Sequence, residues 1–371
     1  MGESVAGAFH QPDTRSSMRT SRNPGDVARG PGHHGRMDAD TVRDGLLQAV
    51  AAAPFSGVVR VEQDGEVVLA QGLGLADRRS GTPNEVTTRF GIASGTKLLT
   101  ALVIVSLVEQ GRLALTTTAR EVLGDDLPLI DDDVTVEQLL CHRSGIGDYL
   151  DESLYADIAD FELPVPAQRL STTQAYLEVL DGHPMASAPG ERFDYNNAAY
   201  VVLAVIAERV SGESFYSLVG RLVCSPAGMV STSFLRSDEL PGGVALGYLD
   251  HDGLRTNVFH LPVRGSGDGG VYTTAPDVSR LWRSFLDGRI VAPSSVDLML
   301  TPRRRDPDAD LDYGLGVWRH HDGVLEIHGY DVGVSFRSLH HRATRTTCTA
   351  LANTGDGVGV LDDLLDAWVR T

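Results

Sequence analysis

A serine and a lysine three residues apart are the strongest chemical signal in this sequence. Ser94 and Lys97 lie in the stretch Phe90-Gly-Ile-Ala-Ser94-Gly-Thr-Lys97, directly before an apolar segment. On a helix this spacing places both side chains on one face, so the lysine amine can reach the serine hydroxyl. Lys97 is the only lysine among the 32 basic residues, and the others are arginines. Because a desolvated lysine can lose its proton whereas an arginine stays charged, the pair fits a serine nucleophile and its base.

The same spacing also arises by chance, and a lone lysine can be an ordinary surface residue. A second group favours the chemical interpretation. In Asp194-Tyr195-Asn196-Asn197 an extended stretch turns into an apolar helix. We expect the Tyr195 phenol to be held by Lys97, with its oxygen placed to accept the proton of Ser94. A core aromatic is the alternative for Tyr195, and a helix N-cap is the alternative for Asn197.

Near the N-terminus the pattern predicts a helix followed by a hairpin and a third strand. Apolar residues recur at helical spacing over 38–53. Two β-branched runs, 56–62 and 67–73, flank Asp64-Gly65, a pair that supplies the positive φ angles of a tight turn. A strand over 87–92 then leads into the Ser94 helix, which we expect to end near Gly111.

The middle of the chain is predicted to be mostly helical, and the last part mostly strand. A capping box at Thr135 to Gln138 begins a short helix, and further helices are predicted over 197–210, 215–224 (ending before Pro226) and 276–286. Strand-like runs follow over 315–319, 324–328, 332–339 and 346–352, before a final helix over 360–369. Strands at both ends with helices between them predict an α+β fold in which the two ends build one antiparallel sheet.

Length and composition indicate one large domain or two interleaved ones. The chain has 371 residues and 42% apolar content, ample for a sizeable core. We expect residues 1–36 to be a disordered leader and 37–371 to be the catalytic domain. Its α/β part would span about 37–93 and 270–371, and its mostly helical part about 94–269. The three cysteines are widely spaced, which favours buried free thiols over disulfides.

Charge and hydropathy exclude several function classes. A net charge of −18 disfavours binding to nucleic acid and to anionic membranes. The longest apolar run, 98–108, falls short of the roughly 20 residues that span a bilayer. With no secretory signal in the leader, the expected location is the cytoplasm.

The motifs together resemble the serine β-lactamase and DD-peptidase superfamily, in its class C and esterase-like branch. That branch uses S-x-x-K, then Y-x-N, then K-T-G or H-x-G, and the resemblance covers about 55–369. Further matching segments are Leu139 to Gly145, Pro189 to Asn197, Gly269 to Ala275 and Tyr313 to Gly316. The resemblance implies a β-lactamase-like fold with an all-helical region inserted, and no cofactor or metal. It also implies that Ser94 is the nucleophile, that Lys97 and Tyr195 handle protons, and that Asn197 holds the acyl side of the substrate.

The third motif departs from this pattern at Ile327-His328-Gly329-Tyr330. If His328 is its first position, Tyr330 replaces the glycine; if Gly329 is its third position, Ile327 replaces the lysine. We prefer the second register because it preserves a glycine where substrate approaches the strand. The oxyanion hole would then be the backbone N–H groups of Ser94 and Tyr330, with His328 and Gly329 on the substrate side. A simple strand residue is the alternative for His328.

This departure bears on the substrate. Penicillins and D-alanyl peptides carry a carboxylate, which a cation in the third motif would help to bind, and Ile327 cannot do so. We therefore expect a serine hydrolase that cleaves a small-molecule ester, lactone, thioester or amide through an acyl-enzyme. An acyltransferase of secondary metabolism using the same site is the alternative, followed by a true β-lactamase or DD-peptidase and a non-catalytic binding scaffold. An α/β-hydrolase is disfavoured because no G-x-S-x-G elbow occurs.

Overall fold

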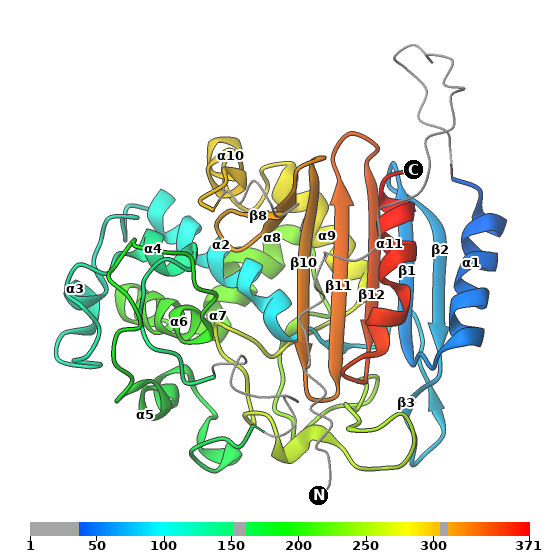
Figure 1. The fold of residues 1–371 in the computed structure, drawn as a ribbon, viewed down its shortest axis with the longest axis horizontal. Coiled ribbons are helices and arrows are strands. Elements are labelled where there is room, and N and C mark those ends of the chain that lie inside the picture. Colours follow the sequence, from blue (N-terminus) through cyan, green and yellow to red (C-terminus); the bar gives the residue numbers. More distant parts are fainter. Residues whose placement is uncertain (1–36, 151–160, 305–310) are drawn as a thin grey trace, which may run out of the picture.

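The two ends of the chain meet in one antiparallel sheet (Figure 1). The structure is a computed structural model that describes residues 37–150, 161–304 and 311–371, so the expected leader 1–36 lies outside the described residues. The strand order is β2-β1-β12-β11-β10-β9-β8. The bounds are β1 (Gly57–Gln63), β2 (Glu66–Leu73), β8 (Leu311–Tyr313), β9 (Trp318–His320), β10 (Val324–Asp331), β11 (Val334–His341) and β12 (Thr346–Ala352). The pairing of β1 with β12 confirms that both ends build the sheet.

The hairpin formed by β1 and β2 turns at the predicted pair. Asp64 and Gly65 have φ values of 53° and 82°, the left-handed conformations that a two-residue hairpin turn requires. Helix α1 (Ala39–Ala52) precedes the hairpin, and its N-cap is Asp38, whose side chain accepts the N–H of Thr41. Two short sheets pair β3 (Leu75–Asp77) with β4 (Thr82–Pro83), and β5 (Phe90–Gly91) with β7 (Val271–Thr273) and β6 (Ser233–Phe234).

Helices cover both faces of the sheet. Helices α1 and α11 (Asp362–Val369) pack on one face, and α9 (Ala275–Leu286) packs on the other (Figure 1). Alternation along a strand divides the side chains between these layers. In β1, for example, Val59 and Val61 join the core under α1 and α11, whereas Val58 joins the larger core on the opposite face.

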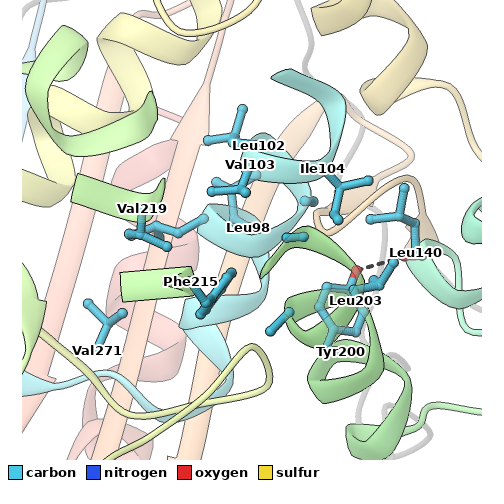
Figure 2. Close-up of a cluster of buried hydrophobic side chains, with 14 of the residues drawn as sticks. Leu98, Leu102, Val103, Ile104, Leu140, Tyr200, Leu203, Phe215, Val219 and Val271 are labelled. Carbon is cyan, nitrogen blue, oxygen red and sulfur yellow. Dashed lines mark hydrogen bonds between the residues drawn. The ribbon is translucent and has the colours of Figure 1, made fainter. Parts of the chain in front are cut away.

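The larger core is built around two helices that are apolar on most sides, α2 (Thr96–Glu109) and α6 (Asn197–Ser211). Residues 96–107 of α2 are all buried, which explains why this helix shows no polar stripe. Figure 2 shows the two helices packed through Leu98, Leu102, Val103, Ile104, Tyr200 and Leu203, with neighbours from the segments that surround them. The Tyr200 hydroxyl donates to the Leu140 carbonyl at 2.7 Å, so the polar atom of this buried ring is satisfied.

The other helices between β5 and β7 lie beside these two, to the left of the sheet and behind it in Figure 1. They are α3 (Ala119–Leu123), α4 (Val136–Leu140), α5 (Leu177–Leu180), α7 (Phe215–Leu218) and α8 (Ser225–Ala227). The predicted capping box of α4 is present, with reciprocal hydrogen bonds between Thr135 and Gln138.

Among the described residues, no helix combines the length and the apolar character needed to cross a membrane. The three cysteines are free and buried, as predicted.

Some elements differ from the predictions. The helix at 215–224 was expected to stop before Pro226, but a π-helical turn (Val219–Cys224) leads into α8, which contains Pro226. A proline is tolerated there because the first turn of a helix needs no N–H donor. Helix α10 (Pro293–Leu300) and strand β8 were not predicted. The strand over 87–92 shortens to β5, and the helix predicted to begin at residue 360 begins at Asp362.

Candidate active site

Ser94 lies in a tight 3-10 turn (Ala93–Gly95) that leads into α2, and not within the α-helix itself. The turn begins with a left-handed residue, Ala93, whose φ is 42°, a strained value for a residue with a Cβ atom. Gly95 is needed next, because a Cβ atom there would come within 2.4 Å of the Phe336 ring on β11. With these two residues the turn packs closely against the sheet. Ser94, which is half-buried, lies between them, where the turn leads into α2.

Lys97 is buried, with only 2% of its surface exposed, and it reaches Ser94 as predicted. Its Nζ lies 2.9 Å from Ser94 Oγ, 2.8 Å from Asn197 Oδ1 and 3.0 Å from the Asp268 carbonyl oxygen. The amide oxygen and the carbonyl can only accept hydrogen bonds, whereas the serine hydroxyl can also donate. When Lys97 is neutral, Ser94 is therefore the one of these three groups that can offer a proton to its lone pair.

Asn197 is the first residue of α6, and its side chain does not cap that helix. The capping oxygen belongs to Asn196, whose Oδ1 accepts the N–H of Ala199 at 2.7 Å. The Asn197 Oδ1 accepts from Lys97, and its Nδ2 donates to the Leu150 carbonyl at 3.2 Å, which fixes the orientation of the amide. The N-cap alternative for Asn197 is therefore wrong, because the preceding asparagine already satisfies the helix end.

Tyr195 lies over Lys97, in a row of aromatic rings. The Lys97 Nζ is 4.9 Å from the centroid of the Tyr195 ring, within the range of a cation–π contact. On its two sides the Tyr195 ring contacts His142, at 4.3 Å between centroids, and Trp318, at 6.3 Å and nearly parallel. Tyr195 is only half-buried, so it lies at the edge of the site and not inside the core.

Gly329 on β10 makes the closest approach to the nucleophile. A Cβ atom at this position would come within 2.6 Å of the Ser94 backbone nitrogen and 2.3 Å of the Ile92 carbonyl, so only glycine fits. The glycine was expected to leave room for substrate, and here the missing side chain leaves room for the backbone of the Ser94 turn. Ile327, two residues earlier on the same face, is buried in the larger core and supplies no cation. Tyr330 follows Gly329, and it lines a small chamber together with Ser94.

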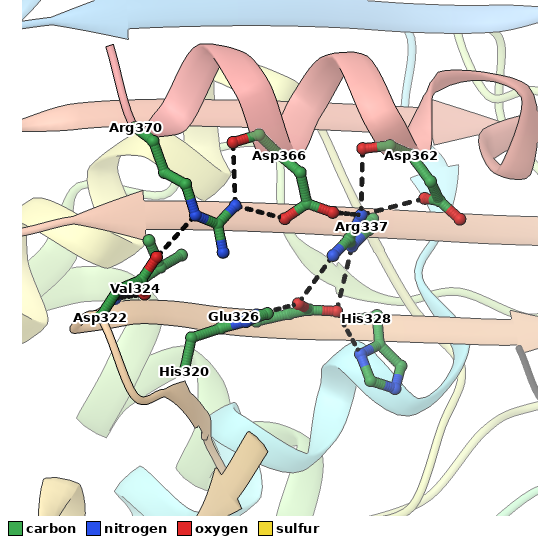
Figure 3. A network of polar contacts seen from close by, with 9 residues as sticks. All are labelled: His320, Asp322, Val324, Glu326, His328, Arg337, Asp362, Asp366 and Arg370. Carbon is green, nitrogen blue, oxygen red and sulfur yellow. Dashed lines mark hydrogen bonds and ion pairs between the residues drawn. The ribbon is translucent and has the colours of Figure 1, made fainter. Parts of the chain in front are cut away.

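His328 lies on the other face of β10, next to Glu326 (Figure 3). Its Nδ1 is 2.8 Å from Glu326 Oε1, and its ring stacks on Trp318 at 5.8 Å. His328 is not among the residues that line the small chamber at Ser94. The structure therefore brings together Ser94, Lys97, Tyr195, Asn197, Gly329 and Tyr330, and it places His328 behind Trp318, one ring away from Tyr195.

Glu326 holds His328 as part of a buried polar cluster beneath α11. Its carboxylate also accepts from His320 and, in a bidentate pair, from Arg337, which in turn contacts Asp362 and Asp366 on α11 (Figure 3). Burial alone would raise the pKa of Glu326, but the hydrogen bonds from His320 and His328 and the charges of His328 and Arg337 outweigh burial and hold it well below its usual range. Because the carboxylate is ionised, the His328 Nδ1 carries a proton.

His142 is a site residue that the sequence did not identify. It is fully buried, and its left-handed backbone, with φ of 56°, turns its ring under Tyr195. The Asn196 N–H donates to Nδ1 at 3.1 Å, so the ring proton is on Nε2, which faces the Tyr313 hydroxyl at 3.2 Å. Burial, together with the charge of Lys97, lowers the pKa of His142 well below its ordinary value. The segment 139–145 matched the family pattern, but nothing in it assigned a role to this histidine.

Two acidic groups near Lys97 were also missed. Asp148 accepts the N–H groups of Asn197 and Ala198 at 2.6 and 3.0 Å, and burial raises its pKa to about 7 despite these bonds. The Asp268 side chain accepts from the Tyr149 hydroxyl at 2.6 Å, and burial raises the pKa of this carboxyl as well. No short-range motif contains these residues, since the fold brings them to Lys97 from separate loops.

A small chamber opens beside the nucleophile. Its volume is about 300 Å³ including its mouth, and it is lined by Ala93, Ser94, Leu150, Asn197, Asp268, Gly269, Tyr330 and Asp331. The predicted nucleophile and the predicted second oxyanion donor therefore face the same space. Within the described ranges, no three His, Cys, Asp or Glu side chains converge as a metal site would require.

Comparisons with known proteins identify the family and the fold of the chain. The model of the Beta-lactamase family matches residues 45–360. Over 87% of its length the chain superposes on 99% of the penicillin-binding protein from Bacillus halodurans, with 35% identity and a TM-score of 0.81. Esterase EstB from Burkholderia gladioli is 31% identical over 63% of this chain and 66% of that protein. The putative penicillin-binding protein PbpX from Bacillus subtilis is 26% identical over 81% of this chain and 71% of that protein.

Proposed function

Because the chain belongs to the beta-lactamase family, we propose that it is a serine hydrolase that forms an acyl-enzyme at Ser94. The observation that carries this proposal is the arrangement around Lys97. This buried amine contacts two oxygens that can only accept and one hydroxyl that can give up a proton, the hydroxyl of Ser94. A base whose lone pair is directed at a serine hydroxyl is the requirement for activating that nucleophile.

In the first step Lys97 takes the Ser94 proton as Oγ forms a bond to the substrate carbonyl carbon. We expect the oxyanion that develops to accept hydrogen bonds from the backbone N–H groups of Ser94 and Tyr330, two residues that line the same chamber. The bond to the leaving group then breaks, and its oxygen, nitrogen or sulfur receives the proton from Lys97 through Tyr195, whose ring lies 4.9 Å from Nζ. In the second step the oxygen of a water molecule bonds to the carbonyl carbon of the acyl-enzyme, the bond from that carbon to Ser94 Oγ breaks, Oγ takes up the proton that the water has lost, and the acid is released.

The proposed substrate is an uncharged ester, lactone, thioester or amide. Ile327 is buried in the core, so the third motif offers no cation for the carboxylate of a penicillin or a D-alanyl peptide. The similarity to esterase EstB supports an ester. We place the acyl side of the substrate near Asn197 and the leaving group near Tyr195.

The test is a labelling experiment with the full chain. The protein is treated with a serine-directed phosphonate, and separately with p-nitrophenyl esters, nitrocefin and a D-alanyl peptide, and the mass of the intact protein and of its peptides is measured. We expect one adduct on the Ser94 peptide, rapid p-nitrophenol release from the esters, and loss of both in Ser94→Ala. If the phosphonate leaves the Ser94 peptide unmodified, the chain is a binding scaffold and the proposal fails.

An acyltransferase would use the same acyl-enzyme, with an alcohol or amine in place of water. Repeating the ester reaction with added alcohols and amines separates the two activities, since transfer requires the acceptor to compete with water. We expect the free acid as the main product. A dominant transfer product at millimolar acceptor would assign the site to transfer.

A further inference from the structure

We propose that the site takes an acyl group with an apolar body and a hydrogen-bonding group at its far end, bound in a second, larger chamber that adjoins the small one. This inference rests on the proposed function, and it names the substrate class for that function. The larger chamber has a volume of about 780 Å³ including its mouth. The two chambers share Leu150, Asp268, Gly269 and Asp331, so a group that begins at Ser94 continues from one chamber into the other.

The larger chamber lies on the acyl side of the reacting bond. Leu150 lines both chambers, and its carbonyl holds the amide of Asn197, which itself lines the small chamber. Tyr195, which protonates the leaving group in the proposed mechanism, lines neither chamber. The leaving group therefore departs towards Tyr195 and Trp318, while the part of the substrate that stays bonded to Ser94 extends past Leu150.

The walls of the larger chamber favour an apolar group. Its apolar lining includes Leu150, Phe161, Leu163, Leu235, Leu261 and Val263. A pocket with such a lining binds a ligand mainly through apolar surface, and a few polar groups fix the orientation. An acetyl group offers little apolar surface to this lining, whereas an aryl or branched acyl group offers more.

Two residues that line the larger chamber each carry a buried polar atom without a hydrogen-bond partner among the described residues. Ser237 Oγ and His260 Nδ1 are almost inaccessible to solvent, and neither has a hydrogen-bond partner among the described residues. Both residues line the larger chamber and neither lines the small one. Buried polar atoms are nearly always paired, so an unpaired pair of atoms in one pocket indicates a ligand group that completes them. A hydroxyl or amide on the acyl group, able both to donate and to accept, would do so.

Charge excludes an anionic acyl group. Asp268 and Asp331 line both chambers, and the described lining of the two contains no arginine or lysine. A carboxylate entering this space would meet two acidic side chains in an environment that screens charge poorly. The acyl group is therefore uncharged, and its polar end bears a hydroxyl or amide and not an acid.

The test compares acyl groups on one leaving group. The full-length protein is assayed for kcat/KM with p-nitrophenyl acetate, phenylacetate, 4-hydroxyphenylacetate and 4-carboxyphenylacetate. We expect phenylacetate to exceed acetate by about tenfold, the hydroxyl to add about another tenfold, and the carboxylate to lose the gain. In a parallel series, 2-naphthyl acetate and phenyl acetate, which vary the leaving group, should differ far less.

Variants locate the effect. Leu261→Trp fills the larger chamber and should remove the preference for phenylacetate over acetate. The combined change Ser237→Ala and His260→Leu should remove only the preference for the hydroxyl. Leu254→Trp is the matched control, because Leu254 is 58% exposed and lines neither chamber, and it should leave both ratios as in the wild type.

The failures can be told apart. If no ester is turned over and Ser94 is not labelled, the proposed function falls and this inference falls with it. If acetate is turned over but phenylacetate is no better, or if the preference follows the naphthyl leaving group, the function stands and the acyl pocket is wrong. The same holds if Leu261→Trp and Leu254→Trp give equal ratios.

Discussion

The two buried ionisable side chains Lys97 and Glu326 lie on opposite sides of strand β10, and the groups that surround them differ. Lys97, between α2 and α6, makes the hydrogen bonds described above to three neutral oxygens. Glu326, on the α11 face of β10, accepts from two histidines and doubly from Arg337. The carboxylate is matched by positive partners and stays ionised, whereas these hydrogen bonds of the amine go to neutral oxygens, and the buried carboxyl groups of Asp148 and Asp268 lie near it.

This difference separates a reactive group from a supporting one. A buried charge with strong ionic partners resists proton exchange, because losing its charge would strand the partners. Burial disfavours the charged form of an amine and so lowers the cost of losing its proton. We therefore assign proton transfer to Lys97. We assign a positioning role to Glu326, because it holds His328, which stacks on Trp318, which in turn stacks on Tyr195. Each prediction below compares the two centres.

The largest expected effect is on turnover at Lys97. Lys97→Arg should lower kcat/KM for a p-nitrophenyl ester by about 10³-fold or more, nearly as far as Lys97→Ala, because arginine keeps the charge and cannot act as the base. Steady-state kinetics measure this, and thermal unfolding shows whether each variant is folded. Turnover close to that of the wild type in the folded arginine variant would remove Lys97 from the mechanism.

At Glu326 the largest effect should be on stability. Glu326→Gln leaves Arg337 without its bidentate partner and should lower the free energy of unfolding by about 3 kcal/mol. Urea denaturation measures this loss. The control is Asp322→Asn, which removes an exposed partner of Arg370 and should cost about 0.5 kcal/mol. Equal losses in the two variants would mean that the cluster is not the structural centre described here.

A smaller effect is expected at Tyr195, which links the two centres. Tyr195→Phe keeps the ring stack but removes the hydroxyl, so kcat should fall by about 10²-fold with little change in stability. Tyr200→Phe is the control, since its hydroxyl is bonded to the Leu140 carbonyl and not directed at substrate. That variant should lose stability and keep most of its turnover. If Tyr200→Phe lost turnover and Tyr195→Phe kept it, Tyr195 would not be the residue that transfers the proton.

The smallest effect is a pH dependence of stability. The pKa of Glu326 is well below its usual range in the folded protein, so the folded state binds fewer protons than the unfolded state as pH falls below about 4.3. The stability contributed by this carboxylate is therefore present above that pH and is lost progressively as pH falls below it, towards the lower pKa of the folded state. The difference in unfolding free energy between wild type and Glu326→Gln should shrink between pH 5 and pH 3. A constant difference would contradict the assignment of an ionised Glu326.

The sequence predicted the fold well where local signals agree with the global arrangement. Asp64-Gly65 specified its hairpin, the Thr135 capping box specified its helix, and strands at both ends specified one sheet. The prediction from the sequence was less accurate at Ser94, which was expected in the helix and lies in the 3-10 turn before it. Neither the left-handed Ala93 nor the contact of Gly95 with Phe336 can be read from neighbouring residues.

At the site, the residues within short motifs were found and those set by tertiary packing were not. Ser94 and Lys97 are in contact because they are three residues apart in the sequence. Asp268 is far from Lys97 in the sequence, and only the tertiary fold brings its carbonyl oxygen to the amine. His328 was expected on the substrate side, but strand alternation from Gly329 places it on the face of Glu326. The alternation of side chains along this strand can be read from the sequence, but the contact of Glu326 with the His328 ring cannot.

The most direct test uses the fact that Lys97 is the only lysine in the chain. In protein labelled with carbon-13 at lysine Cε, one NMR signal reports the protonation of this single amine. If Lys97 is the base for Ser94, the pH midpoint of that signal coincides with the midpoint of the acid limb of kcat/KM for a p-nitrophenyl ester, because that limb reports the base of the free enzyme. A signal that does not change across the pH range in which kcat/KM rises to its plateau would contradict the account.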